Sequence, residues 1–300
     1  MMSKNNWGRW GADDERGALN HLTPEVIKAA AAAITTGKVY SLGIPIQGQG
    51  VPLLDYRGTP MRLTLQDGTD DGMFAVYGAQ DGTGAHEDVL VMASHTTSHM
   101  DALIHVYEDH KHYNGVPFSE MRALGGAAKL GIEKVDSFAA RAVILDIVKL
   151  KGADKWLEPG TMIMAADLQA AADAQGTEVR AGDVVLIRTG HLDMWWAGNA
   201  AGEPEGFLQA GIGSDAAAWL AEKDVTAVGS DNAAVEVIPF DNNDFLIVHK
   251  MLLVQAGIYM LEHLDLRQPC EDGNYEGVIA VSPLKVTGAT GSPINPVFIS

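Results

Sequence analysis

The sequence is short of cysteine, of basic residues and of long apolar runs, and each shortage excludes a class of protein. Cys270 is the one cysteine in 300 residues, so no disulfide can form within the chain and a reducing, cytoplasmic location is expected. Lys and Arg number 21 against 39 Asp and Glu, giving a net charge of −18 that disfavours nucleic acid and anionic membranes as partners. No apolar run reaches the roughly 18 residues of a membrane span. The first ten residues lack the apolar stretch of a secretory signal.

Several familiar catalytic motifs are also missing. The sequence has no Gly-x-Ser-x-Gly, no Walker loop, no Gly-x-Gly-x-x-Gly after a strand and no His-Glu-x-x-His. The glycine-rich stretch 288–293 lacks the lysine of a phosphate loop, so we interpret it as a tight turn. Cys270 is a poor candidate nucleophile because the adjacent Glu271 and Asp272 oppose formation of a thiolate.

Histidine, by contrast, is concentrated in one place. Five of the ten histidines lie between residues 95 and 112, and three of them fall in the run His95-Thr-Thr-Ser-His99-Met-Asp101-Ala-Leu-Ile-His105. Imidazole and carboxylate are the usual ligands of a catalytic zinc or manganese ion. The run therefore predicts a metal site, and a metal with open coordination positions is typical of a hydrolase.

The spacing of this run restricts its geometry. On a helix, His95 and His99 share a face but Asp101 points away. On a straight strand all four groups share a face, but His95 and Asp101 would be about 20 Å apart, far beyond the reach of one ion. We therefore expect a sharp bend, which the small residues Ser98 and Ala102 would permit.

Other polar residues are candidates for the same site. His249 lies within an apolar predicted helix and Glu262 closes an apolar predicted strand, where a carboxylate needs a cation or hydrogen-bond donors. Either residue alone is equally consistent with a core position. For His110 and His112, in a polar stretch that ends at a turn, we expect a solvated loop.

From residue 141 onward, predicted strands and helices alternate, which indicates an α/β fold with some parallel strands. Strands are expected at 142–148, 183–189, 225–229, 258–262 and 277–286, and helices at 167–174, 215–222 (capped by Ser214) and 243–255. Nearer the N-terminus, a helix capped by Thr23 should run to Gly37, with a strand at 39–42 behind it. Residues 43–86 are expected to form loops around short strands.

Substrate-pocket candidates come from two places. Asp231 follows a predicted strand, and ligands of such sheets gather beyond the carboxyl ends of the strands. Phe74 and Tyr77 lie between two turns of the long loop region, where they either line the pocket or anchor the loop.

The His95–His105 run resembles the His-x-Gly-Thr-His-x-Asp-x-Pro-x-His signature of the metal-dependent cyclase-family hydrolases, which include arylformamidase (kynurenine formamidase) and isatin hydrolase. Thr97, Ser98 and Leu103 depart from the signature, at positions that are not ligands. The resemblance extends over nearly the whole chain. Its further segments are 7–20, 113–115, 182–190, 229–232, 249–253 and 288–296.

The resemblance implies a role for each site residue. His95, His99 and Asp101 would bind the metal and His105 would donate and accept protons, while His249 and Glu262 would complete a two-ion site bridged by Asp101. One or two ions, Mn²⁺ or Zn²⁺, are implied. The implied fold is a swivelling β/β/α architecture with a mixed sheet, in one domain over residues 1–300. A homodimer or homotetramer is implied, with residues 1–40 a candidate for packing on a neighbouring subunit.

Three functions follow as alternatives. The first is a hydrolase that cleaves the C–N or C–O bond of a small cyclic amide, imide, aryl formamide or lactone, by metal-activated water with His105 as general acid and base. The second is a cyclase or dehydratase that acts on a polyketide-like substrate at the same metal. The third is a metal-dependent binding protein without turnover.

Overall fold

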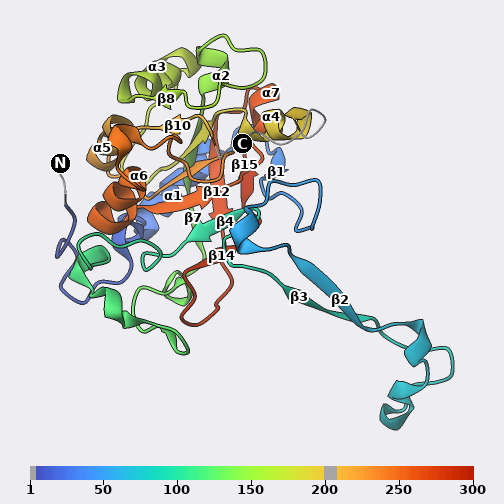
Figure 1. Ribbon diagram of the computed structural model, residues 1–300. Helices are drawn as coiled ribbons and strands as arrows, with labels where there is room; N and C mark the ends of the chain where they lie inside the picture. The colour runs from blue at the N-terminus through green and yellow to red at the C-terminus, as the bar shows by residue number, and fades with distance from the viewer. Residues whose placement is uncertain (1–4, 199–207) are drawn as a thin grey trace.

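Nine strands form one mixed sheet in the computed structural model, which describes residues 5–198 and 208–300 (Figure 1). In spatial order they are β1 (Val39–Ser41), β15 (Val297–Ile299), β13 (Glu276–Val281), β7 (Phe138–Asp146), β9 (Val184–Arg188), β11 (Ala227–Ser230), β12 (Tyr259–Glu262), β4 (His99–Asp101) and β14 (Gly291–Pro293). Strands β7, β9, β11 and β12 are parallel, and the outer pairs are antiparallel. The mixed α/β fold predicted from the sequence is confirmed.

Helices and short strand pairs surround the sheet. The helices are α1 (Pro24–Ala30), α2 (Ile147–Leu150), α3 (Ala165–Gln175), α4 (His191–Gly198), α5 (Ser214–Glu222), α6 (Ile247–His249) and α7 (Arg267–Glu271), with a π-helix at Lys250–Ala256. The pairs are β8 (Met162–Ile163) with β10 (Gly211–Ile212) and β5 (Met121–Arg122) with β6 (Gly126–Ala127). Because the central strands are covered, their residues are buried and almost wholly apolar.

Local sequence signals located most elements, but several boundaries differ. The Thr23 hydroxyl accepts a hydrogen bond from the Val26 amide, as expected of an N-cap, yet α1 ends at Ala30 and a single 3₁₀ turn follows. The predicted cap by Ser214 is wrong, because Ser214 is the first helical residue and donates its hydroxyl to Asp241. The last long strand ends at Val281 rather than at residue 286.

The apolar helix predicted at 243–255 has a different shape. It begins at Ile247 because Leu246 takes a left-handed conformation with φ of 54°. From Lys250 to Ala256 it widens into a π-helix. Such widenings occur frequently at functional sites, and this one directly follows His249.

One hairpin leaves the body of the molecule. Strands β2 (Met61–Gln66) and β3 (Glu87–Val91) pair only with each other and form an arm that ends in two 3₁₀ turns, Gly68–Asp70 and Met73–Tyr77. Figure 1 shows this arm extending well beyond the sheet and its helices. Within residues 5–198 and 208–300, no helix is long and apolar enough to cross a membrane.

The N-terminal segment lies against its own chain. The Trp7 indole donates to the Val254 carbonyl at 2.7 Å, and the Ala18 amide donates to the Gly257 carbonyl at 2.8 Å. These bonds hold the segment beside the π-helix that follows His249. Its packing on a neighbouring subunit stays a prediction.

Candidate metal centre

Strand β4 carries the core of the site. It is inserted between β12 and β14, and its register places His99 opposite Glu262 and Asp101 opposite Gly291. The sharp bend expected from the spacing is present, although it falls at Thr97, whose φ is 58°, rather than at Ser98. This left-handed turn brings His95 back beside Asp101, so the Nδ1 of His95 lies 2.7 Å from Asp101 Oδ1.

Five side chains from three parts of the chain converge at this place. They form two groups of possible metal ligands, His95 with His99 and Asp101, and Asp101 with His249 and Glu262, and within each group the ligand atoms lie within 4.8 Å of one another. The five candidate ligands named from the sequence are therefore together.

Asp101 belongs to both groups. Its Oδ1 faces the ring nitrogens of His95 and His99, the latter at 3.6 Å, while its Oδ2 lies 3.8 Å from His249 Nε2. Glu262 closes the arrangement, with its two oxygens 3.1 Å from His99 Nε2 and 3.4 Å from His249 Nε2. One carboxylate thus lies between two sets of donors, as a bridging ligand would.

The chemistry of these atoms suits a divalent cation. All five residues are buried, yet His99 Nε2 and Asp101 Oδ2 have no hydrogen-bond partner among the described residues. Buried polar atoms are nearly always paired, so an unpaired nitrogen and an unpaired carboxylate oxygen within one cluster indicate that the cluster suits a cation. Nitrogen and carboxylate oxygen together are donors that Zn²⁺ and Mn²⁺ accept.

The same proximity shifts the pKa values of the cluster. Burial alone would lower the pKa of His249, but hydrogen bonds with Glu236 and Glu262 raise it to about 10. The pKa of His99 is also raised, chiefly by the charge of Glu262 against the opposing effect of burial. Burial opposes ionisation of Glu262, yet the charge of His99 and the hydrogen bond with His249 lower its pKa to about 2. Without a cation, the cluster therefore holds protons that a metal would displace.

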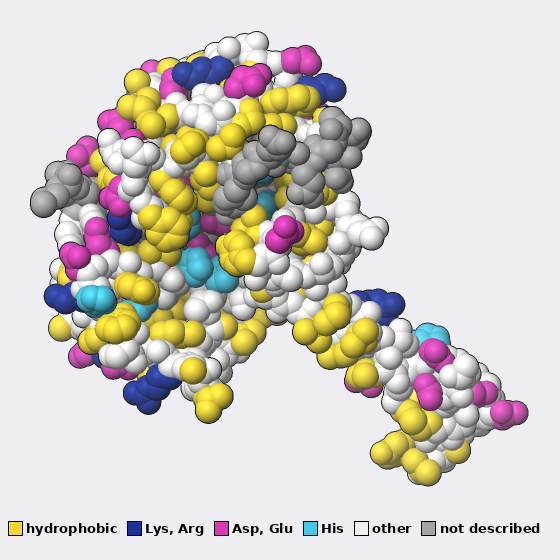
Figure 2. All heavy atoms as spheres, viewed as in Figure 1, with side chains coloured by type: hydrophobic (Ala, Val, Ile, Leu, Met, Phe, Trp, Pro, Cys, Tyr) yellow, Lys and Arg dark blue, Asp and Glu magenta, His cyan; other side chains and the backbone are white. Residues whose placement is uncertain are grey.

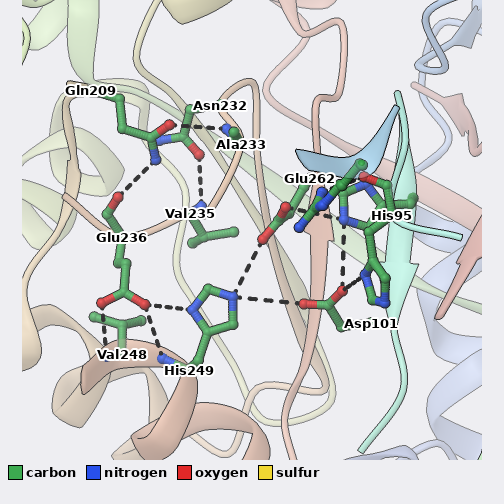
Figure 3. A network of polar contacts seen from close by, with 12 residues as sticks. His95, Asp101, Gln209, Asn232, Ala233, Val235, Glu236, Val248, His249 and Glu262 are labelled. Carbon is green, nitrogen blue, oxygen red and sulfur yellow. Dashed lines mark hydrogen bonds and ion pairs between the residues drawn. The ribbon is translucent and has the colours of Figure 1, made fainter. Parts of the chain in front are cut away.

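Glu236 is a further candidate for the site, which the sequence did not single out. It is fully buried, and its Oε1 accepts a hydrogen bond from His249 Nδ1 at 2.5 Å (Figure 3). The amides of Val248 and His249 donate to the same carboxylate. The only sequence signal was a single acidic residue in the apolar run 233–238. This contact fixes which nitrogen of His249 faces Asp101 and Glu262.

His105 lies beside the ligands. Its ring stacks on that of His95 at 4.0 Å between centroids and lies 6.3 Å from that of His249. It is half-buried, and this desolvation lowers its pKa to about 3, so the ring is neutral near pH 7. In Figure 2, histidine and acidic side chains are visible at the bottom of a hollow near the middle of the face shown.

The turn at 288–293 takes part in the site, which its sequence did not indicate. Thr290 Oγ1 lies 2.8 Å from His95 Nε2. A Cβ at Gly291 would lie 2.6 Å from His95 Cε1, so the absence of a side chain there makes room for the ring. Besides turning the chain, this segment therefore holds the His95 ring in place.

The remaining candidates lie elsewhere. Phe74 and Tyr77 are at the tip of the arm, away from the ligands of their own chain. Asp231 is buried and accepts from the Thr189 and Gly190 amides, which holds the turn before α4. His110 is exposed as expected, but the prediction for His112 is wrong. Its ring is buried and lies 2.9 Å from the Val106 carbonyl, because the loop folds back on itself.

Comparisons with known proteins agree with this geometry. A family model described as "Putative cyclase" matches residues 18–237. A solved structure described as a novel cyclase is 37% identical, with a TM-score of 0.87 over 99% of this chain and 98% of its own. An isatin hydrolase bound to the product analogue thioisatinate is 19% identical, with a TM-score of 0.63 over 93% of this chain and 99% of its own.

A second isatin hydrolase, from Labrenzia aggregata, is 17% identical with a TM-score of 0.58, over 87% of this chain and 93% of its own. At such identities, these two likenesses concern the fold. Among curated proteins, no sequence matches this chain.

Replacing Glu236 should weaken metal binding without unfolding the protein. In Glu236→Gln the side chain keeps its size, but the charge that orients His249 is lost, so we expect the dissociation constant for Zn²⁺ to rise about 10–100-fold. Competition with a fluorescent chelator measures this, and circular dichroism checks the fold. Glu158→Gln, at an exposed position, is the matched control. Equal affinity in both variants would argue against the orienting role.

Metal affinity should also depend on pH. The ligand histidines bind metal only when neutral, and the pKa of His249 near 10 means that its proton must leave. Affinity for Mn²⁺ should therefore increase about tenfold per pH unit for each proton displaced, from pH 6 upward, and level off only above pH 10. Calorimetry in buffers of different ionisation enthalpy counts the released protons. A pH-independent affinity with no proton release would contradict the proposed ligand set.

Proposed function

Because the chain belongs to the cyclase family and its buried ligands converge beside a neutral histidine, we propose that it is a metal-dependent hydrolase of a small cyclic amide, imide, aryl formamide or lactone. The observation that carries the proposal is the buried Asp101 carboxylate, which belongs to both groups of possible metal ligands. The likeness to isatin hydrolases supports this reaction class. A reducing cytoplasm would suit the single buried cysteine.

His95, His99, Asp101, His249 and Glu262 would hold one or two divalent ions, Mn²⁺ or Zn²⁺. An ion held there would supply Lewis acidity, which acidifies water and polarises a carbonyl group. The outer partners Glu236 and Thr290 keep the ligand rings in place. The five side chains are buried, so contact with bulk water is limited and the electrostatic interactions among them are strengthened.

His105 is the proton carrier in this proposal. Its ring is neutral near pH 7, so a ring nitrogen can accept the proton of an attacking water. The nearby Asp101 charge favours the protonated ring that results, and the proton can then pass to the leaving nitrogen or oxygen. The stack against His95 keeps the ring close to the ligands during both transfers.

A cyclase reaction is the second candidate, because the family model and the solved structure that is 37% identical to this chain are both described as cyclases. In that case the same ion would polarise a carbonyl and acidify a neighbouring C–H, and His105 would remove that proton. The product would form by ring closure with loss of water.

The variant His105→Ala should separate catalysis from metal binding. We expect kcat to fall about 10²–10⁴-fold, the usual contribution of general acid–base catalysis, while metal content stays at the wild-type level. Asp101→Ala, the contrasting variant, should lose metal together with activity. Elemental analysis and steady-state kinetics measure both. Wild-type turnover in His105→Ala would contradict the role of His105 in proton transfer. Full metal occupancy in Asp101→Ala would contradict the role of Asp101 as a metal ligand.

Acid release tests the reaction class. Isatin, formanilide, a cyclic imide and a lactone each yield a carboxylic acid on hydrolysis, so the metal-loaded protein should consume base in a pH-stat with at least one of them. The metal-free protein serves as the control. A product lighter by one water, with no base consumed, would indicate the cyclase or dehydratase reaction instead. Binding without any product would indicate a non-catalytic binding protein.

A further inference from the structure

The place of the His105 ring is set mainly through the backbone that carries it. No group within residues 5–198 and 208–300 forms a hydrogen bond with this ring, and its closest ring contact is the stack on His95, at 4.0 Å between centroids. A stack is less directional than a hydrogen bond, so the ring nitrogens lie where the backbone of His105 puts them. On its N-terminal side, that backbone is held by the hydrogen bond from the His105 amide to the Ala102 carbonyl, at 2.9 Å.

His112 holds the same backbone on the C-terminal side. Its Nδ1 lies 2.9 Å from the carbonyl oxygen of Val106, the residue next to His105, and no other donor among the described residues reaches this oxygen. Because a carbonyl group can only accept, Nδ1 carries the proton and donates it. Burial lowers the pKa of His112, so the ring is neutral near pH 7.

The loop between these two residues reverses direction, which brings His112 back to the start of the loop. Asp109 and His110 both take left-handed conformations, with φ of 48° and 62°, and the residues on either side of them exchange backbone hydrogen bonds of 2.9 and 2.8 Å. Such conformations are uncommon outside glycine, so contacts around the turn must hold them. One such contact is the hydrogen bond from Gln255 Nε2 to the Glu108 carboxylate, at 2.7 Å, which ties the loop to the π-helix.

An imidazole at position 112 is costly for a residue that only fills space. His112 is 2% exposed, and its Nε2 has no hydrogen-bond partner among the described residues. A buried nitrogen without a partner destabilises a fold, whereas a leucine of similar size would not. Packing alone therefore does not account for the imidazole, whose one hydrogen bond is with the Val106 carbonyl.

We propose that His112 is a positioning residue, which fixes the Val106 carbonyl and thereby holds the His105 ring where proton transfer requires it. This inference rests on the proposed function, since His112 has this role only if His105 carries the proton. Displacement of a reacting group by about 1 Å can slow a reaction about 10²-fold. No hydrogen bond or ion pair within the described residues joins His112 to a candidate metal ligand, so metal affinity should not depend on it.

Two variants separate the hydrogen bond from the bulk of the ring. His112→Leu keeps the bulk and removes the donor, so kcat should fall about 10–100-fold, with KM, zinc content and the circular dichroism spectrum unchanged. His112→Asn keeps an N–H donor near the place of Nδ1 and should recover most of the loss. Lys111→Gln, one residue away with an exposed side chain, is the matched control and should keep the wild-type kcat. Equal kcat in wild type and His112→Leu, or an equal loss in His112→Leu and His112→Asn, would overturn the proposal.

A double variant tests whether His112 acts through His105. If it does, His112→Leu should add no further loss of kcat to His105→Ala, because the residue that it positions is gone. Losses that multiply in the double variant would mean that His112 affects turnover by another route, which contradicts the proposal.

Nuclear magnetic resonance of the zinc-loaded protein, with isotope-labelled histidine, gives a readout that needs no substrate. The His112 ring should show the Nδ1–H tautomer near pH 7, and the His105 ring signals should shift or broaden in His112→Leu while those of His249 stay in place. Failure of the proposed function would leave these signals unaffected. An Nε2–H tautomer at His112, or identical His105 signals in both proteins, would be evidence against the positioning role.

Discussion

A carboxylate with no access to solvent sets the constraint on which the site depends. Asp101 is fully buried, and an isolated charge in that position would cost many kcal/mol. Its charge is tolerated because three histidines face its two oxygens from different sides. Burial alone would raise the pKa of Asp101, but the charge of His105, the hydrogen bond with His95 and the charges of His95 and His99 hold it well below its usual range. Each element around β4 contributes either a histidine or a group that holds a histidine in place.

The sequence was enough to locate the centre of this arrangement but not its periphery. His95, His99 and Asp101 lie within seven residues, and their spacing alone required the bend that Thr97 supplies. His249 and Glu262 stood out as polar residues in apolar runs, and the family resemblance placed them. Glu236 and Thr290 could not be assigned, because their contacts depend on which strands lie side by side. No local sequence pattern predicts a strand order in which β4 lies between β12 and β14.

The elements show the same division between local and tertiary causes. The Thr23 cap and the end of α3 at Gly176, whose φ is 69°, are local signals, and both are present. The late start of the helix before His249 depends on the left-handed Leu246, which no propensity favours. The arm illustrates the other limit. Alternation at residues 61–65 indicates a strand, but it cannot tell whether the apolar side meets the chain's own core or another molecule.

One rule links the three ligand histidines. In each ring, one nitrogen is held from outside the cluster: His99 Nδ1 by the Thr97 carbonyl, His249 Nδ1 by Glu236, and His95 Nε2 by Thr290. The other nitrogen then faces Asp101 in His95, and both Asp101 and Glu262 in His99 and His249. A neutral imidazole has one N–H and one nitrogen lone pair, so an outer acceptor that receives the hydrogen bond from the N–H leaves the lone pair facing inward.

This applies directly to His99 and His249, whose partners are acceptors only. For His95 the partner is a hydroxyl, which can either donate or accept, so its ring can change tautomer without losing the contact. His95 is therefore the least fixed of the three ligands, and it is the one on which His105 stacks. In the proposed reaction, the adjustment that accompanies proton transfer would fall on this side, while Glu236 and the Thr97 carbonyl hold the rings of His249 and His99 in place.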